Sequence, residues 1–279
     1  YLTGDLQFQS HDWQLRQKMI GHAAGHRLDA LWEFFNPRFG FVTRITPKLS
    51  LFVNVGRARK EPADNQIISA DDVWSTPVQV AAESIWDYET GISFHNSYIE
   101  FNVNGYIIEY KNEQLKNINI EQEGEYSYYS ADRTRHQGVE LETTIRPLPS
   151  LIISGNGTLN YDIFTSGMHT GNYLPHFPRS LMNLRCVWQK PNYEIGIHLK
   201  YVGLQFLDDE NRWDIAPWTV ANLYGQYTYR KITVKLRIDN IFDKLYATNG
   251  YGYQWDGQDY IFYWPAATRS LFGSIEYEF

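Results

Sequence analysis

The sequence has little of several features that define common protein classes. Its 279 residues include one cysteine, Cys186, so an internal disulfide and a cysteine-rich metal site are both excluded. No run of about 18 apolar residues occurs, which excludes a transmembrane helix. The net charge of −7 provides no basic face for nucleic acid. Helical periodicity is also poor along almost the whole chain.

Aromatic residues and strand-like alternation are abundant instead. Phe, Trp and Tyr make up 16% of the chain. Between Val139 and Arg146, odd positions carry Val, Leu, Thr and Ile, and even positions carry Glu, Glu, Thr and Arg. This period of two predicts a β-strand with one apolar and one polar face. The same pattern occurs at 49–55, 99–104, 151–163, 193–200, 232–239 and 270–279.

The alternating segments are longer than those of ordinary soluble sheets. A soluble β-sandwich also alternates, but its strands average about five to six residues. A tilted strand needs about 9–11 residues to cross a bilayer, and backbone groups in lipid must be paired within a closed sheet. The sequence therefore predicts an all-β, antiparallel transmembrane β-barrel. The twelve predicted strands are 1–9, 36–45, 49–59, 84–94, 97–110, 135–146, 150–164, 178–189, 192–203, 217–229, 231–239 and 268–279.

The connections alternate between short and long. Tight turns are expected at 46–48, 95–97, 147–150, 189–192 and 230–231. Long polar loops are expected at 11–33, 60–83, 111–133, 165–177, 205–216 and 241–267. Outer-membrane barrels have short periplasmic turns and long extracellular loops. The last strand then runs toward the periplasm and presents Phe279 as an interfacial aromatic anchor.

The strand parity also predicts which side chains face lipid. The expected lipid-facing set is Leu51, Val53, Phe101, Leu141, Ile195, Val234 and Ile275, with Cys186 on the same face. The expected inward-facing set is Glu140, Glu194, Lys235 and Glu276.

Four motifs occur in an order that resembles the C-terminal half of a TonB-dependent outer-membrane receptor. They are Lys60-Glu61-Pro62 after a strand, Asp87-Tyr88-Glu89-Thr90-Gly91 within a strand, Gly138-Val139-Glu140, and Asn240 to Tyr246 in the pattern Asn-x-Phe-Asp-x-x-Tyr. The likeness runs from about Phe34 to the terminal Phe279. It implies a receptor that imports a ferric siderophore or a similar metal chelate by energy-coupled active transport.

The resemblance also implies that this chain is incomplete. The family has a barrel of about 22 strands filled by an N-terminal plug, and twelve strands cannot enclose such a plug. Residues 1–279 are therefore interpreted as the C-terminal half of the barrel. The implied partners are the missing N-terminal strands and plug, TonB through that plug, outer-membrane lipid and the chelate, with no cofactor. On this interpretation the strand at 271–279 does not pair with residues 1–9, and both pair with other segments.

Two other classes of barrel remain as alternatives. A closed twelve-stranded outer-membrane phospholipase has about this length, but it needs a His-x-Ser-Asn-Gly stretch. Here Asn249-Gly250 has no preceding His-x-Ser, and the nearest upstream histidine is His198. A nucleophile without a base in reach is not activated. A passive porin shares the barrel but lacks the motifs.

Candidate ligand contacts lie in the predicted extracellular loops, where aromatic rings stack on planar chelates and histidines bind metal-containing ligands. They are His22, His26, Trp74, Tyr128, Tyr129, His169, His176, Trp213 and Trp255. For each ring, packing between loops is the competing interpretation, and a solvated loop is the competing interpretation for each histidine. No third ligand accompanies either histidine pair, so no metal site is predicted.

Overall fold

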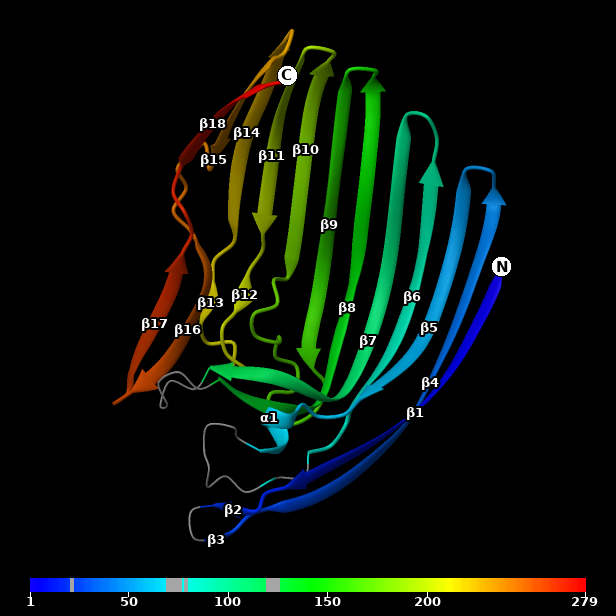
Figure 1. Ribbon diagram of the computed structural model, residues 1–279, viewed down its shortest axis with the longest axis vertical. Coiled ribbons are helices and arrows are strands. Elements are labelled where there is room, and N and C mark those ends of the chain that lie inside the picture. The colour runs from blue at the N-terminus through cyan, green and yellow to red at the C-terminus, as the bar shows by residue number, and fades with distance from the viewer. Residues whose placement is uncertain (21–22, 69–76, 78–79, 119–125) are drawn as a thin grey trace.

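The computed structural model describes residues 1–20, 23–68, 77, 80–118 and 126–279. Its main feature is one curved antiparallel sheet of twelve strands (Figure 1). In order across the sheet these are β1 (Leu2–Arg16), β4 (Arg27–Thr46), β5 (Leu49–Lys60), β6 (Glu83–His95), β7 (Ile99–Ile118), β8 (Tyr126–Leu148), β9 (Leu151–Phe164), β10 (Ser180–Lys190), β11 (Tyr193–Val202), β14 (Trp218–Tyr229), β15 (Ile232–Asp239) and β18 (Ser270–Tyr277). All twelve predicted strands are confirmed. The short turns lie together at the top of Figure 1, and the long connections lie at the opposite end.

Smaller elements belong to the long connections. They are β2 (Met19–Ile20), β3 (Ala23–Ala24), α1 (Asp64–Ile67), β12 (Gln205–Phe206), β13 (Asp214–Ile215), β16 (Ala247–Trp255) and β17 (Gln258–Pro265). No helix in the described part of the chain is both long and apolar enough to span a membrane.

Three predicted loops are wrong in detail. Most of 11–33 and the described part of 111–133 continue the strands β1, β4, β7 and β8. The third loop, 241–267, contains the hairpin of β16 and β17. The alternation of apolar and polar residues is strong only where the two faces of a strand meet different surroundings, so it gives little signal in these segments.

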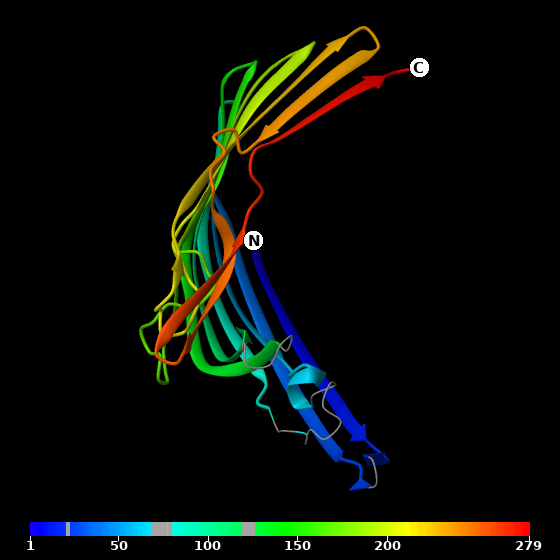
Figure 2. The same cartoon turned by 90° about the vertical axis from the view of Figure 1, so that its left-hand side faces the viewer.

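The two faces of the sheet carry the two predicted sets of side chains. The register aligns Leu141 with Val103, and Glu140 with Asn104 on the other face. The convex face is apolar and exposed, as at Leu141, whereas α1 lies on the concave side (Figure 2), where Trp13 donates a hydrogen bond to Asp64 over 2.9 Å. The prediction that the lipid-facing and inward-facing sets occupy opposite faces is therefore confirmed.

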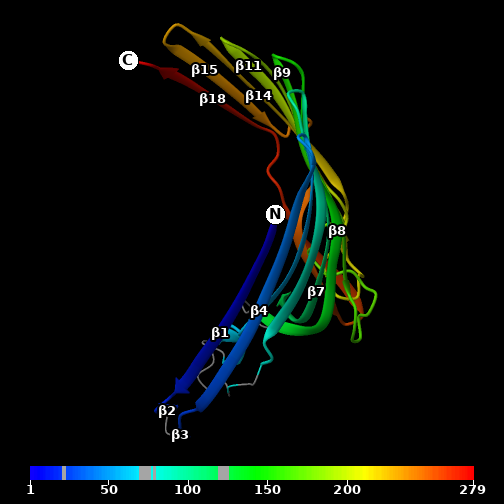
Figure 3. The ribbon, with the colours of Figure 1, turned by 90° about the vertical axis from the view of Figure 1, so that its right-hand side faces the viewer.

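The sheet is open, and its edge strands β1 and β18 curve toward the same side (Figure 3). Among the described residues no ladder joins them: β1 pairs with β4 and β18 pairs with β15. This confirms that 271–279 does not pair with 1–9. Pairing of both edges with other segments stays a prediction.

Two apolar clusters support the loop end of the sheet. The first consists of Val202, Leu207, Trp213, Ile215, Trp218 and Val220. The second consists of Leu115, Ala131, Phe164 and Leu174. They pack the long connections against the concave face and thereby position the polar groups described next.

Candidate ligand-binding site

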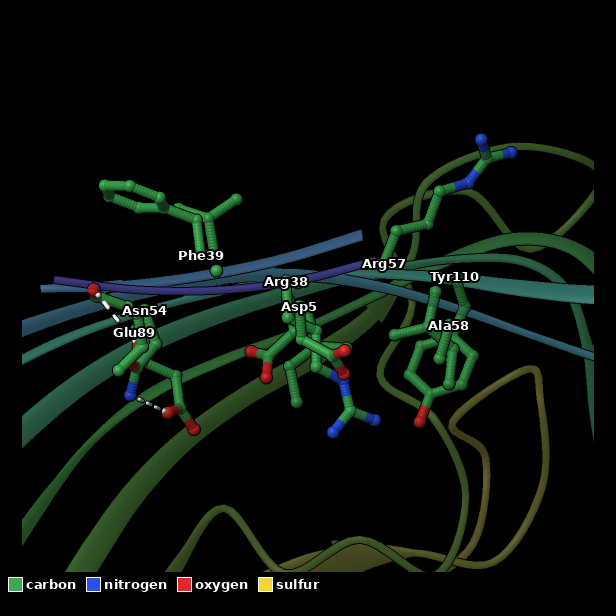
Figure 4. A pocket seen from close by; sticks show the side chains of 16 residues that line it. Asp5, Arg38, Phe39, Asn54, Arg57, Ala58, Glu89 and Tyr110 are labelled. Carbon is green, nitrogen blue, oxygen red and sulfur yellow. Dashed lines mark hydrogen bonds between the residues drawn. The ribbon is translucent and has the colours of Figure 1, made fainter. Parts of the chain in front are cut away.

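A polar groove of about 710 Å³ runs along the concave face of β1, β4, β5, β6 and β7. Figure 4 shows Asp5, Arg38, Glu89 and Tyr110 on one side of the strands, while Arg57 points to the opposite side. Alternation explains this arrangement, because side chains two residues apart share a face. The concave wall is thus lined by charged and hydrogen-bonding groups.

The groove is rich in carboxylates. Asp5, Asp87 and Glu89 face it with one guanidinium, that of Arg38. Asn54 donates a hydrogen bond to Glu89 over 3.4 Å, whereas Oδ1 of Asp87 is buried without a hydrogen-bond partner among the described residues. Buried polar atoms normally have a partner, so this wall fits contact with water or with another polar protein segment.

A buried cluster of one imidazole and two carboxylates lies nearer the loops. Nδ1 of His136 is 3.1 Å from Asp162, and its Nε2 is 3.1 Å from Glu113. Thr134 donates a further hydrogen bond to Glu113. Both ring nitrogens can donate only in the imidazolium form, which therefore satisfies both contacts. The cluster joins strands β7, β8 and β9 at the end of the sheet that carries the long loops.

A local change of backbone conformation brings Glu113 into this cluster. Asn112 has a φ of 58°, a left-handed value that asparagine tolerates better than most residues. Beyond it the odd-numbered residues Glu113 and Leu115 of β7 are buried, whereas before it the even-numbered Tyr110 lines the concave groove. The flip turns an acidic side chain toward His136.

Three of the predicted ligand residues meet around Asp209 in the connection between β11 and β14. Tyr129 donates a hydrogen bond to Asp209 over 2.6 Å. Burial raises the pKa of Asp209, although the Tyr129 hydrogen bond and the nearby imidazoles of His169 and His176 act in the opposite direction. The ring of His169 also contacts Phe164, with 5.6 Å between centroids. The structure therefore brings two histidines, a phenol and a carboxylate into one loop layer.

The other predicted residues are not gathered there. His22 and Trp74 lie outside the described residues, and Tyr128 belongs to β8 without a described side chain. His26 lies beside β3, where its backbone nitrogen is 3.3 Å from the side chain of Gln17, near the β1 edge of the sheet, whereas β9 lies near its centre.

The two tryptophans differ in exposure. Trp213 is 8% exposed and packs inside the first apolar cluster, against Gly252 of β16. Trp213 therefore packs between loop elements. Trp255 is 65% exposed at the tip of the β16–β17 hairpin. The same strand, β16, carries Tyr251, which stacks on Phe262 across the hairpin with 5.1 Å between ring centroids.

Several site residues were not predicted, although the sequence carried a signal for some. His136 has the same parity as Gly138 and Glu140, so alternation already placed it on the inward face. Asp256-Gly257 is a dipeptide typical of tight hairpin turns, and both residues have a positive φ. The contact of Tyr129 with Asp209 joins residues 80 positions apart and left no local pattern. No group of three or more His, Cys, Asp or Glu in the described ranges is arranged to hold a metal ion.

A model of the β-barrel of TonB-dependent receptor-like proteins matches residues 7–241. The chain belongs to this family. Its members are receptors and transporters, which confirms the prediction that it is not an enzyme and removes the support for the phospholipase alternative. The family is one of bacterial outer-membrane proteins.

Known relatives are longer than this chain. The pesticin receptor of Yersinia enterocolitica is 26% identical over 183 residues, which cover 62% of this chain and 26% of that receptor. The solved ferric yersiniabactin uptake receptor of Yersinia pestis superposes with a TM-score of 0.76 at 19% identity, covering 98% of this chain and 42% of the receptor. The siderophore receptor PiuA of Acinetobacter baumannii gives 0.73 at 16%, covering 99% and 40%. The chain thus spans less than half of each relative.

Proposed function

We propose that this chain is the C-terminal part of the barrel of an outer-membrane receptor that imports a ferric siderophore or similar metal chelate. The family match over residues 7–241 carries the proposal. The concave wall supports it, because charged groups such as Asp87 and Glu89 suit a lumen filled by water and a plug. In this proposal the plug and the remaining strands complete the receptor, and TonB drives transport through the plug.

The main proposed ligand contacts are Tyr129, His169 and His176 in the loop layer around Asp209, and the exposed Trp255 at the tip of the β16–β17 hairpin. Further candidates are His22, His26, Trp74 and Tyr128. Trp213 would act indirectly, by holding the hairpin that carries Trp255. Phenol and imidazole groups around a partly buried carboxylate offer hydrogen bonds to the polar periphery of a chelate.

The test uses the full-length receptor in a strain lacking its own copy. Cells are starved for iron and offered radioiron as catecholate, phenolate or hydroxamate chelates, with haem and a copper chelate as separate arms. We expect uptake of one class that disappears in a TonB-deficient strain. Uptake that persists without TonB would contradict energy coupling and favour the passive porin.

The ligand contacts are tested with matched variants. Replacing His169 and His176 together by Gln should weaken chelate binding about tenfold, since each lost hydrogen bond contributes about 0.5–1.5 kcal/mol. His198→Gln, on the concave wall away from the loop layer, serves as the control. Equal affinity of the double variant and the control would remove the histidines from the binding site.

A further inference from the structure

The convex face has a hollow that the transport function does not use. It holds about 700 Å³ across β5, β6, β7, β8 and β9. Its floor includes Gly105, which the register aligns with Thr90 on one side and Val139 on the other. The convex side chains that surround the floor are mainly apolar: Val53, Val55, Tyr88, Ile107, Val139, Leu159 and Tyr161.

Nothing in the backbone requires the glycine at this point. A Cβ atom added to Gly105 would meet no atom closer than 3.9 Å, and its φ is not in the left-handed region. The hollow therefore exists because a side chain is missing, not because the sheet bends there. By contrast, a Cβ at Gly138 would lie 2.5 Å from the carbonyl oxygen of Leu159.

Basic side chains lie directly on the loop side of the hollow. We define the basic ledge as Arg57, Lys111, Arg133 and Arg135. Lys111 and Arg133 are directly opposite each other on β7 and β8, and like charges in that position repel. Among the described residues neither forms an ion pair, whereas Arg135 binds Glu109 over 2.6 Å. Within the described ranges, the carboxylate of Glu109 is therefore the one anion that forms an ion pair with the four cations of the ledge.

Arg57 adds an unsatisfied donor to the ledge. Its guanidinium lies over the indole of Trp86, 5.5 Å from the ring centroid, and its Nε is buried with no hydrogen-bond partner in the part of the chain that the structure describes. Figure 4 shows its side chain pointing away from Arg38 and the concave groove. An anionic oxygen at the ledge would supply the missing acceptor and separate the opposed cations.

We propose that this face binds a phosphorylated lipid of the outer leaflet, with an acyl chain in the hollow and phosphate at the basic ledge. Glu109, which is directly opposite Arg135, is two residues beyond Ile107, and Lys111 is four residues beyond it. At about 3.3 Å per residue, the ledge therefore lies about 7–13 Å from the hollow on its loop side. Tyr88 and Tyr161 at the hollow and Trp86 at the level of the ledge match the aromatic belt of a membrane interface. Only a molecule with an anionic head and an apolar chain satisfies both parts.

The proposal rests on the outer-membrane placement in the proposed function but not on the cargo. The loop side of the apolar band corresponds to the outer leaflet in such barrels. The side chains of the ledge are on the convex face, so they take no part in chelate binding. The two proposals can therefore fail separately.

The test measures lipid retention by the full-length receptor in detergent, using native mass spectrometry. The probes are a bisphosphorylated lipid A, the same lipid without phosphates, and inorganic phosphate alone. Wild type should retain the bisphosphorylated lipid at least tenfold more tightly than the dephosphorylated one, and millimolar phosphate should not compete with it. Equal retention of the two lipids, or full displacement by inorganic phosphate, would overturn the proposal.

Two variants separate the two parts of the surface. Lys111→Gln with Arg133→Gln changes exposed positions and should abolish the preference for the phosphorylated lipid. Gly105→Leu should weaken retention of both lipids about tenfold by filling the hollow. Gly225→Leu, also on the convex face, has its nearest non-neighbour atom 3.6 Å from an added Cβ and should behave as wild type. Loss of retention in Gly225→Leu equal to that in Gly105→Leu would contradict the site.

Chelate uptake by the same variants should stay at the wild-type level. A receptor that retains lipid as described but imports no chelate would overturn the proposed function and leave the lipid site standing.

Discussion

The convex and concave faces of β7, β8 and β9 are built from alternate residues of the same strands, yet they have opposite character. Leu159 on the convex face is 59% exposed, while Asp162 on the concave face is 4% exposed. A soluble sheet would bury the leucine and expose the aspartate. The inversion shows that the convex face is built for an apolar solvent and the concave face for a polar, hydrogen-bonded interior.

The largest expected effect comes from breaking the buried cluster on the concave face. His136→Leu leaves Glu113 and Asp162 buried without their shared partner, and removal of one member of a buried ionic group costs about 3–5 kcal/mol. Guanidinium unfolding of the full-length receptor in lipid vesicles measures the change. His198→Leu is the control, because the imidazole of His198 forms no hydrogen bond or ion pair with any described residue. Equal losses in both variants would remove the special role of the cluster.

A slightly smaller effect is expected from charging the convex face. Leu141→Arg places a cation in the bilayer and should cost about 2–4 kcal/mol near its midplane. Glu140→Arg, one residue away on the concave face, should cost much less. The fraction of heat-modifiable folded barrel in isolated outer membranes reports both. A greater loss in Glu140→Arg would reverse the assignment of the faces.

The contrast between the two faces also explains where sequence alternation could predict the strands. Where one face of a strand is apolar and the other polar, alternation predicted the segments around Leu141 and Ile195 and the face of each side chain. Toward the long loops that contrast disappears. The extensions of β7 and β8 and the hairpin of β16 and β17 therefore looked like loops, although Asp256-Gly257 marked the hairpin turn. The cluster at His136 depends on the left-handed Asn112, which no periodicity reveals.

A moderate effect is expected in the loop layer. Tyr129→Phe removes a hydrogen bond to the Asp209 carboxyl group, and hydrogen bonds to charged groups contribute about 1.5–3 kcal/mol. The connection between β11 and β14 should become more sensitive to limited proteolysis. Asp209→Asn keeps an acceptor for the hydroxyl group and should protect this connection nearly as well as wild type. Identical cleavage rates of Tyr129→Phe and wild type would show that the contact does not hold the loop.

The smallest effect is expected at an exposed ion pair. Arg146 is 2.6 Å from Glu100, and both side chains are well exposed. Such pairs contribute about 0–1 kcal/mol, so Arg146→Gln should shift the unfolding midpoint only slightly. Thermal unfolding in detergent at low and high salt measures it. A loss as large as that of His136→Leu would show that exposure does not separate the two kinds of ionic contact.

Spin labelling along β8 tests the opposition of the two faces most directly. Single cysteines at each position from 139 to 143 are introduced into the full-length receptor without other cysteines, labelled, and reconstituted in vesicles. Labels at 139, 141 and 143 should collide more with oxygen, which concentrates in lipid, than labels at 140 and 142, giving a period of two. A reversed period, or uniform accessibility along the strand, would contradict the account.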